Sequence, residues 1–532
     1  MWLRNQNFAL TAKNRKSENK MEKSVAKIYS AELEGINAKL IEVEVDLNVG
    51  LHSFNIVGLA DKALNEAKER VNSALKNSGT KPPNRENRKI TVNLAPADVK
   101  KTGSQYDLAI ALGYLLSTKQ LGEFETENKI FIGELSLDGR LRPANGALNI
   151  AEMGGKRGFE YLFLPKENSS EAAVIKNIKV IPVESLQEVI EILEKKKPAI
   201  PEIFRGLNDD TEDDGNYIPD FSEIRGQENA KRAMTIAASG GHNLLMSGPP
   251  GVGKSLLAQA MVSILPDVLI EEAVEITKIY SAAGVNKSGL MKRRPFRSPH
   301  QTASVVAIVG GGSQPKPGEI SLAHLGVLFL DELPEFQKNI LESLRQPLET
   351  GKVHIARAKD TLTFPARFTL VAAMNPCPCG FYGDAEKECR CSAYEVIRYQ
   401  KKISGPLLDR IDLQIKVPRV KTGELIDKKT YEPESGKIKN KVESARKIQS
   451  ERFKKLKIRT NAEMSSKQAE EFANMDASAE KFIATLDKAR LSPRGYYRLL
   501  KTARTIADID ETEKMSSGNL AEAFSYRLRD EA

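Results

Sequence analysis

Cysteine and tryptophan are scarce in this chain. Its 532 residues include 4 cysteines and 1 tryptophan, and all the cysteines lie between residues 377 and 391. Cysteine confined to one short segment argues against the disulfide scaffolds of small secreted proteins. No apolar run approaches the roughly 18 residues that a membrane-spanning helix requires, and residues 1–20 lack the continuous apolar core of a secretory signal. These absences predict a cytoplasmic protein with no membrane partner.

An excess of acidic residues is also missing. Lys and Arg number 80 against 71 Asp and Glu, which gives a formal net charge of +9. This balance permits an anionic partner such as nucleotide or nucleic acid, although solvated lysine-rich faces produce the same balance. With 40% hydrophobic and 28% charged residues, the composition is typical of a soluble globular protein. The length predicts roughly two to four domains.

The apolar pattern divides the chain into five segments. Residues 1–21 are basic and polar, and they predict a disordered extension, either upstream of the true start or an organelle presequence. Residues 22–197 alternate strand-like and helix-like stretches and predict an α/β domain. Residues 198–217 are rich in Pro, Gly and acidic residues, as in a mobile linker. Residues 218–420 predict a second α/β unit, and residues 421–532 are helical in pattern.

Two local signals sharpen the prediction for the first domain. The stretch "KIFIGELSLDGRLRP" predicts a hairpin that turns at Asp138 and Gly139. The stretch "SLQEVIEILEKKK" predicts a helix whose first turn is capped by Ser185.

A phosphate-binding loop is the strongest signal in the sequence. In "NLLMSGPPGVGKSLLAQAMV" an apolar strand leads into Gly-x-x-x-x-Gly-Lys-Ser, and a helix follows. The glycines let backbone N–H groups surround phosphates, the lysine supplies a positive charge to them, and the serine hydroxyl can bind Mg²⁺. The helix N-terminus adds its dipole. The predicted nucleotide-binding residues are Gly248, Pro249, Pro250, Gly251, Val252, Gly253, Lys254 and Ser255.

Polar residues at the ends of later strands complete the predicted site. The stretch "GVLFLDELPEF" presents Asp331, which can hold Mg²⁺ together with Ser255, and Glu332, which can polarise the attacking water. The strand "FTLVAAMNP" ends at Asn375, whose amide can orient that water. The turn in "GPLLDRIDL" presents Arg410, whose guanidinium suits phosphoryl charge and can serve a neighbouring subunit.

The order of these motifs resembles that of AAA+ ATPases. Their amino-acid sequences are similar to those of the YifB/ComM family of magnesium-chelatase-like AAA+ proteins. The similar stretches include "RPFRSPHQT", "LRQPLETG", "NPCPCGFYGD" and "CRCS". The resemblance implies a ribosomal-S5-like N-domain, a P-loop AAA+ core and a helical C-terminal lid. It also implies an ATP- and Mg²⁺-dependent homo-oligomer, a hexameric ring, that migrates branches in single-stranded or branched DNA during natural transformation.

The resemblance assigns a role to each site residue. Lys254 and Ser255 match Walker A, Asp331 and Glu332 match Walker B, and Asn375 matches sensor 1. Arg410 matches the arginine finger.

Three further positions are implied. Arg494, in "LSPRGYYRLLKTARTIAD", matches sensor 2, which would contact the γ-phosphate of its own subunit; the alternative is an exposed helix residue. Gly226 and Gln227, in "IRGQENAKRAM", match the segment near the adenine.

The first domain resembles the proteolytic domain of Lon and its relative in RadA. Lon-type proteolysis needs a serine nucleophile and a lysine base. The chain has Leu148 where that lysine is expected, and "KKTGSQYDLAIALG" lacks the Gly-Pro-Ser pattern. We therefore expect no protease activity.

Basic residues gather in three places that could contact DNA backbone. One insertion carries Lys292, Arg293, Arg294 and Arg297, and a predicted hairpin carries Arg357 and Lys359 near its tip. In the chelatase-like group such insertions face the central pore, but solvated turns have the same composition. The third place is the basic stretch at residues 452–459, for which a charged helix face is favoured over a contact with DNA.

The four cysteines have the spacing Cys-x-Cys, nine residues, Cys-x-Cys. Four thiolates suit a tetrahedral, structural Zn²⁺, whereas an iron–sulfur cluster, a redox switch and free thiols stay open. The predicted ligands are Cys377, Cys379, Cys389 and Cys391.

Two other functions compete with a DNA motor. One is an ATPase that remodels a protein partner, with the first domain as adaptor. The other is the metal-insertion motor of magnesium chelatase, which fits less well because the cysteine segment and the Lon-like domain exceed what such a subunit needs.

Overall fold

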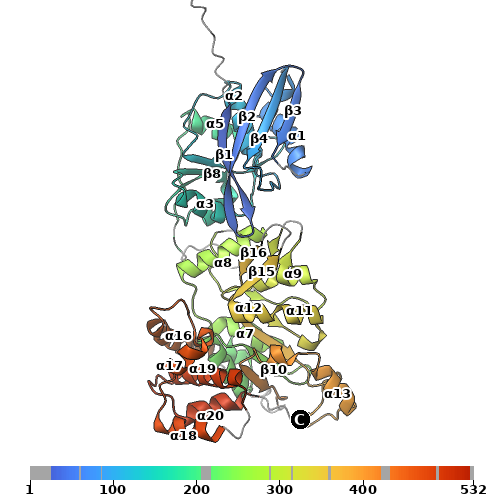
Figure 1. The fold of residues 1–532 in the computed structure, drawn as a ribbon, viewed down its shortest axis with the longest axis vertical. Helices are drawn as coiled ribbons and strands as arrows, with labels where there is room; N and C mark the ends of the chain where they lie inside the picture. Colours follow the sequence, from blue (N-terminus) through green and yellow to red (C-terminus); the bar gives the residue numbers. More distant parts are fainter. Residues whose placement is uncertain are drawn as a thin grey trace, which may run out of the picture. The chain divides into compact units, whose positions relative to one another are not determined.

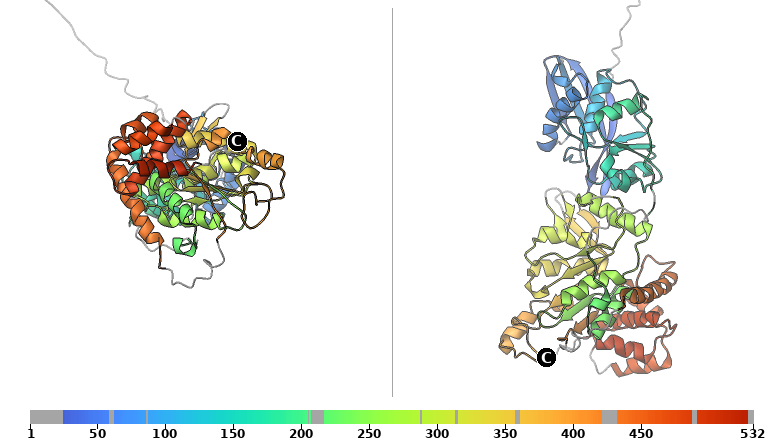
Figure 2. Two further views of the ribbon diagram at one scale, coloured as in Figure 1. Left: turned by 90° about the horizontal axis from the view of Figure 1, so that it is seen from below. Right: turned by 180° about the vertical axis from the view of Figure 1, so that it is seen from behind.

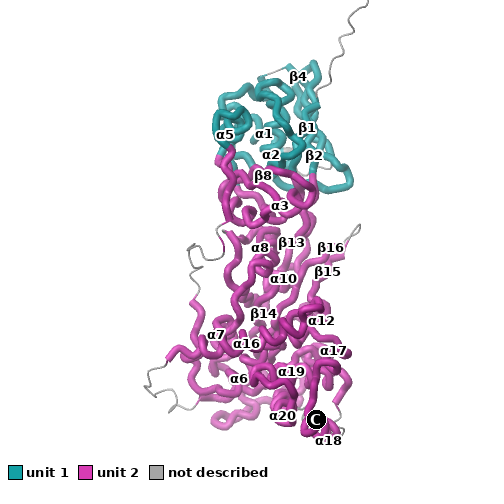
Figure 3. The backbone as a smooth tube through the Cα atoms, turned by 90° about the vertical axis from the view of Figure 1, so that its left-hand side faces the viewer, with its two compact units in different colours: residues 1–30, 41–142, 185–198 teal, residues 31–40, 143–184, 199–532 magenta. Residues whose placement is uncertain are grey.

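The fold was analysed in a computed structural model. It describes residues 25–58, 62–85, 87–204, 206, 217–286, 289–312, 315–356, 361–420, 432–486 and 491–527. The chain forms two compact units (Figure 3). Unit 1 comprises residues 1–30, 41–142 and 185–198, and unit 2 comprises residues 31–40, 143–184 and 199–532. The predicted domain limits at 21, 197, 217 and 420 stay predictions, and residues 1–21 and most of the predicted linker lie outside the described residues.

The N-terminal part of the chain contains a seven-stranded mixed sheet. Its strand order is β3-β4-β2-β1-β5-β8-β9. The antiparallel β2–β4 pair shows why these segments are strands: Ile41, Val43 and Val45 are buried while the residues between them are partly exposed. The strands are β1 (Ala26–Glu34), β2 (Asn37–Val49), β3 (Ser53–Val57), β4 (Arg88–Ala95), β5 (Lys129–Phe131), β8 (Tyr161–Pro165) and β9 (Lys179–Val183).

The local signals in this part are confirmed. Strands β6 (Glu134–Leu135) and β7 (Leu141–Arg142) pair antiparallel around Gly139, whose φ is 86°. The Ser185 side chain accepts a hydrogen bond from the N–H of Glu188 at the start of α5 (Leu186–Leu193). The other helices are α1 (Lys62–Asn77), α2 (Asp107–Ser117), α3 (Ala147–Lys156) and α4 (Ser169–Ala172).

A five-stranded parallel sheet organises the central part of unit 2. Its order is β11-β14-β17-β10-β18, and every neighbouring pair is parallel. The inner strands are short, apolar and buried on both faces, as expected for a parallel sheet covered by helices. The strands are β10 (Leu244–Ser247), β11 (Phe296–Arg297), β14 (Val327–Leu330), β17 (Thr369–Met374) and β18 (Leu413–Lys416).

Helices lie around this sheet (Figure 1), and two small hairpins are inserted between its strands in the sequence. The predicted hairpin forms from β15 (Lys352–Ala356) and β16 (Thr361–Pro365), although Arg357 and Lys359 lie outside the described residues. The second pairs β12 (Gly310–Gly311) with β13 (Lys316–Pro317). The helices are α6 (Glu228–Gly240), α7 (Lys254–Ile264), α8 (Ile270–Ala283), α9 (Val305–Val309), α10 (Glu319–Leu322), α11 (Lys338–Ser343), α12 (Arg345–Thr350), α13 (Ala393–Gln400) and α14 (Gly405–Leu408).

The C-terminal part is helical, as the sequence predicts. Helices α16 and α19 pack on α6, and α16 also packs on α7, beside the parallel sheet (Figures 1 and 2). Its helices are α16 (Ser435–Arg452), α17 (Ser466–Glu471), α18 (Ala477–Thr485), α19 (Pro493–Ile509) and α20 (Ser517–Ser525). No helix in the described residues has the length and apolar character needed to span a membrane.

A buried ionic network holds these helices together. Asp508 is fully buried and accepts from both Arg452 Nη atoms, at 2.5 and 2.8 Å. It also accepts from Asn461 Nδ2 at 2.8 Å and from Arg504 Nε at 3.0 Å. Removing one member of such a network leaves uncompensated buried charge.

Replacing Asp508 with Ala should lower the free energy of unfolding by about 3–5 kcal/mol, because the buried guanidinium of Arg504 and the partly buried guanidinium of Arg452 lose their carboxylate. Denaturant titration of the full chain measures this loss. The matched control is Glu432→Ala, which breaks the exposed pair with Lys437 and should leave the unfolding midpoint unchanged. Equal losses in the two variants would contradict the buried network's role.

Asp107 is a buried titrating group in unit 1. Its carboxylate accepts from Arg70 Nε at 2.7 Å and from the N–H of Leu135 at 3.2 Å. Burial raises the pKa of Asp107 to about 6, because it outweighs the lowering by Arg70 and by the Leu135 N–H. The folded chain therefore holds this proton more tightly than the unfolded chain. Folding stability falls as the pH rises from about 4 to about 6, and then levels off.

Between about pH 4 and about pH 6, the unfolding free energy of the Asp107→Asn variant should fall by about 3 kcal/mol less than that of the unchanged chain, because the asparagine side chain cannot ionise. Unfolding free energies of both chains, measured in steps between about pH 4 and about pH 7, test this. A stability difference between the chains that stays constant across the range would contradict the burial argument.

Candidate nucleotide-binding site

The phosphate-binding loop connects β10 to α7. Gly251 and Gly253 have φ values of 79° and 88°, a region that favours glycine. Gly248 is required for a different reason: a Cβ atom there would lie 2.2 Å from the backbone oxygen of Val417. The glycines of the motif therefore serve both the backbone turn and the close approach of the neighbouring strand.

Lys254 is held inside this loop. Its Nζ donates to the carbonyl oxygens of Gly248 at 2.6 Å and Pro249 at 2.9 Å, and to Asn375 Oδ1 at 3.1 Å. Burial lowers the pKa of Lys254, and the carboxylates of Asp331 and Glu332 oppose that shift. The residues predicted as Walker A lysine and sensor 1, 121 positions apart in the sequence, are thus in direct contact.

Ser255 and Asp331, the predicted Mg²⁺ ligands, are also in contact. Ser255 Oγ donates to Asp331 Oδ2 at 2.8 Å. Hydroxyl and carboxylate oxygens are the ligand types that Mg²⁺ prefers. Glu332, the next residue, has a φ of 50° and donates its N–H to Asp331 Oδ1 at 2.9 Å. A left-handed backbone at a non-glycine residue costs about 1–3 kcal/mol and is concentrated at functional sites.

Gly226 and Gln227 precede α6. Both have positive φ values, 62° and 61°. The Gln227 amide donates from Nε2 to the backbone oxygen of Pro418 at 2.6 Å, just beyond β18. The segment predicted near the adenine is therefore tied to the strand beside the phosphate-binding loop.

Arg410 and Arg494 lie together at a different place. Arg410 Nη2 and Arg494 Nη2 both pair with the Glu349 carboxylate, the latter at 3.5 Å. Arg410 Nη1 also donates to the backbone oxygen of Pro406 at 2.6 Å. Neither arginine bonds to Lys254 within the part of the chain that the structure describes. The sensor-2 assignment of Arg494 stays a prediction.

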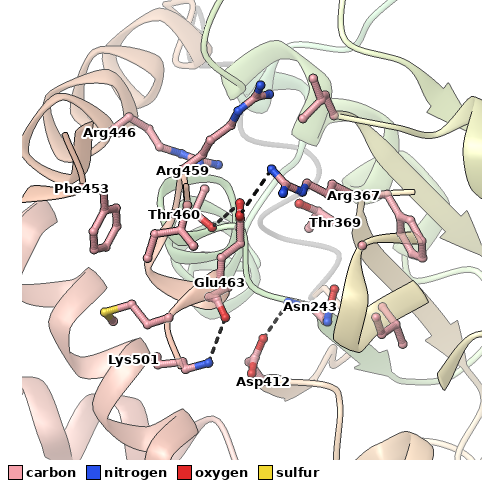
Figure 4. A pocket seen from close by; sticks show the side chains of 18 of the residues that line it. Asn243, Arg367, Thr369, Asp412, Arg446, Phe453, Arg459, Thr460, Glu463 and Lys501 are labelled. Atoms are coloured by element: carbon pink, nitrogen blue, oxygen red, sulfur yellow. Dashed lines mark hydrogen bonds and ion pairs between the residues drawn. The ribbon is translucent and has the colours of Figure 1, made fainter. Parts of the chain in front are cut away.

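The two arginines line a cavity of about 1160 Å³. Figure 4 shows other residues that line it, including Arg446 and Lys501. Burial lowers the pKa of the Lys501 ammonium and lowers that of Arg446 to about 10. Neither this cavity nor the role of Glu349 can be predicted from the sequence. The stretch "LRQPLETG" contains Glu349, but no periodicity relates that carboxylate to arginines 61 and 145 positions away. Other cations around the cavity are Arg294, Arg367, Lys447, Lys454, Lys457, Arg459 and Arg498.

The basic insertion is more constrained than a solvated turn. Arg294 donates to Glu272 and to the backbone oxygens of Pro266 and Leu325. Arg297 pairs through two nitrogens with Glu319, at 2.6 and 2.7 Å. The guanidinium groups of Arg294 and Arg297 are therefore already paired within the chain.

Leu148, at the position where a Lon-type lysine is expected, is fully buried. It packs in an apolar cluster with Ala273, Ile276 and Tyr280. Its surroundings are those of a core residue.

The four cysteine sulfurs converge. The Sγ distances are 3.4 Å for Cys377–Cys379, 3.6 Å for Cys379–Cys389 and 3.7 Å for Cys377–Cys389, and all four sulfurs lie within 4.8 Å of one another. Four sulfurs each about 2.3 Å from a tetrahedral Zn²⁺ would lie about 3.8 Å apart. The cluster therefore fits a metal of this size without rearrangement of the backbone.

Backbone N–H groups point at these sulfurs. The N–H of Tyr382 donates to Cys377 Sγ at 3.3 Å. Hydrogen bonds from the N–H groups of Phe381 and Arg390 lower the pKa of Cys379 to about 6. A backbone hydrogen bond also lowers the pKa of Cys389 and of Cys391, but desolvation and the neighbouring cysteines outweigh it and raise both pKa values. Such bonds stabilise thiolates, the form in which cysteine binds metals.

Known proteins are similar to this chain over nearly its whole length. Family models described as "Magnesium chelatase, subunit ChlI", "Subunit ChlI of Mg-chelatase" and "Magnesium chelatase, subunit ChlI C-terminal" match residues 220–425, 43–168 and 432–527. Competence protein ComM of Haemophilus influenzae is 42% identical over 509 residues, covering 95% of this chain and 97% of its own length. YifB of Escherichia coli is 41% identical over 519 residues, covering 95% and 98%.

A more distant similarity covers a smaller part. The magnesium-chelatase 38 kDa subunit of Cereibacter sphaeroides is 29% identical over 177 residues, which is 29% of this chain and 52% of that protein. The full-length matches therefore decide the assignment: this chain belongs to the YifB/ComM family of magnesium-chelatase-like proteins.

Proposed function

We propose that this protein is a Mg²⁺-dependent ATPase that assembles into a homo-oligomeric ring, a hexamer, in the cytoplasm. In this proposal it uses ATP hydrolysis to migrate branches and remodel strands in single-stranded or branched DNA. The observation that carries the ATPase role is the contact of Lys254 with Asn375 beside the contact of Ser255 with Asp331. The proposal also includes an S5-like N-domain without protease activity and a helical C-terminal lid.

The site supports a division of roles among the residues. The loop amides and Lys254 would bind the β- and γ-phosphates. Ser255 and Asp331 would hold Mg²⁺, which when bound would supply positive charge to the phosphates. Glu332 would accept the proton of the attacking water, and Asn375 would orient that water. Gly226 and Gln227 would lie near the adenine.

Arg410 and Arg494 would supply charge to the phosphates from another direction. Both guanidiniums share one carboxylate, Glu349. The Nε atom of Arg410 is buried and has no hydrogen-bond partner among the described residues. A ring arrangement would bring Arg410 to the nucleotide of an adjacent subunit, where a guanidinium stabilises transition-state charge. Arg494, as sensor 2, would contact the γ-phosphate of its own subunit.

The DNA role rests on similarity. The relative from Haemophilus influenzae is named a competence protein, and it is similar to this chain over nearly its full length. A metal-insertion motor is less well supported, because the chelatase subunit of Cereibacter sphaeroides aligns with 29% of the chain at 29% identity, whereas the competence protein aligns with 95% at 42% identity. An ATPase that remodels a protein partner is the remaining alternative.

ATP turnover should rise several-fold when forked or three-strand DNA is added, and strand displacement should accompany it. Lys254→Ala should lower turnover by about 100-fold or more, because a charged phosphate contact is lost. Lys437→Ala, an exposed lysine on α16, is the matched control and should retain full turnover. Turnover without any DNA stimulation or strand displacement would reject the DNA motor and favour a protein substrate.

We also propose that the cysteine cluster holds structural Zn²⁺. Elemental analysis of the purified chain should find about one zinc per chain, and the Cys389→Ser, Cys391→Ser double variant should hold almost none. Iron with inorganic sulfide in place of zinc would identify a cluster instead. A metal content far below one per chain would reject the site.

A further inference from the structure

The cysteine loop, residues 376–391, packs directly on the phosphate-binding loop. Gly380 has a φ of 87°, and a Cβ atom there would lie 2.6 Å from Pro250 Cδ and 3.9 Å from Asn375 Cγ. The backbone at Gly380 is therefore in contact with a residue of the Gly-x-x-x-x-Gly-Lys-Ser motif. It also lies against the asparagine that bonds to Lys254.

The other side of the cysteine loop is tied to the segment after β18. Asp384 accepts from Arg419 Nε at 2.8 Å, and the Arg419 guanidinium lies 5.6 Å from the Phe381 ring centroid. Pro418, next to Arg419, accepts from Gln227. The cysteine loop thus connects two parts of the candidate nucleotide site, the phosphate-binding loop and the predicted adenine segment.

The contacts that hold the cysteine loop, apart from its sulfurs, are local and polar. Asp384 accepts from the N–H groups of Glu386 and Lys387, and Gln400 donates to the backbone oxygen of Pro376. Residues 376–391 contain no helix or strand, and only Cys377 and Gly380 among them are buried. Its internal backbone bonds join Gly380 to Cys377 and Asp384 to Phe381. An apolar core cannot hold such a segment, whereas one ion bound by four thiolates would close the loop at both ends.

We propose that a thiolate-preferring divalent metal ion, bound by the four cysteines, shapes the cysteine loop into a wall of the nucleotide site, so that metal occupancy sets nucleotide affinity. This inference rests on the proposed nucleotide site and on the cysteine metal site, and it adds the coupling between them. The contact of Gly380 with Pro250 is the physical link. When the metal is lost, the loop would no longer support the phosphate-binding loop from this side.

The test measures the Kd of a fluorescent ATP analogue with Mg²⁺ on the full-length chain. The zinc-loaded protein is compared with protein treated with a chelator and then dialysed. We expect the Kd to rise tenfold or more on metal removal and to recover when Zn²⁺ is added back. Circular dichroism before and after treatment checks that the chain stays folded.

A pair of glycine variants isolates the contact without touching the cysteines. Gly380 and Gly383 both have positive φ values, 87° and 75°, but a Cβ atom at Gly383 meets nothing within 4 Å. Gly380→Ala and Gly383→Ala therefore impose similar backbone strain, and only the first pushes against Pro250. We expect both variants to retain zinc and only Gly380→Ala to raise the Kd, by about tenfold or more.

The outcomes separate the coupling from the functions on which it rests. Equal Kd values for zinc-loaded and zinc-free protein, or for the two glycine variants, overturn the coupling alone. A loaded chain that binds the analogue no better than Lys254→Ala overturns the nucleotide site and the coupling with it. A purified chain that holds no metal and still binds the analogue overturns the metal site and the coupling while leaving the ATPase proposal in place.

Discussion

The parallel pairing of β10 with β17 and β18 is the constraint on which the candidate site depends. Ser247 lies in register with Met374 on one side and with Lys416 on the other. Parallel strands in register end at the same edge of the sheet. The residues that follow, Gly248 and Asn375, therefore emerge side by side, and Lys254 can reach both. A shift of one residue in the β10–β17 pairing would turn Asn375 to the opposite face of the sheet, away from Lys254.

Two separate groups of charged side chains lie in unit 2. One group lies at the sheet edge, where the positive charge of Lys254 faces the carboxylates of Asp331 and Glu332. The other lies in the cavity lined by α16 and α19, where cations outnumber carboxylates and where Glu349 joins Arg410 to Arg494. Each group is held by its own hydrogen bonds and ion pairs.

The cysteine loop also contacts the phosphate-binding loop at this edge of the sheet. It follows β17 directly, so a single stretch of chain carries first the amide of Asn375 and then the thiol of Cys377. After the cysteine at 377, the chain turns back, and the backbone at Gly380 packs against Pro250 of the phosphate-binding loop. Short-range sequence order thus places the cysteine cluster beside the candidate nucleotide site, and the turn at Gly380 brings their backbones into contact.

The sequence by itself determined the features that depend on local chemistry. The glycine spacing of the phosphate-binding loop, the apolar strands that end at Asp331 and Asn375, the Ser185 cap and the Asp138–Gly139 turn all follow from residue type and short-range geometry. Only the tertiary structure decided which distant groups meet. Glu349 accepts both Arg410 and Arg494, and Gly380 rests on Pro250, because strand register and helix packing bring together residues that no sequence periodicity relates.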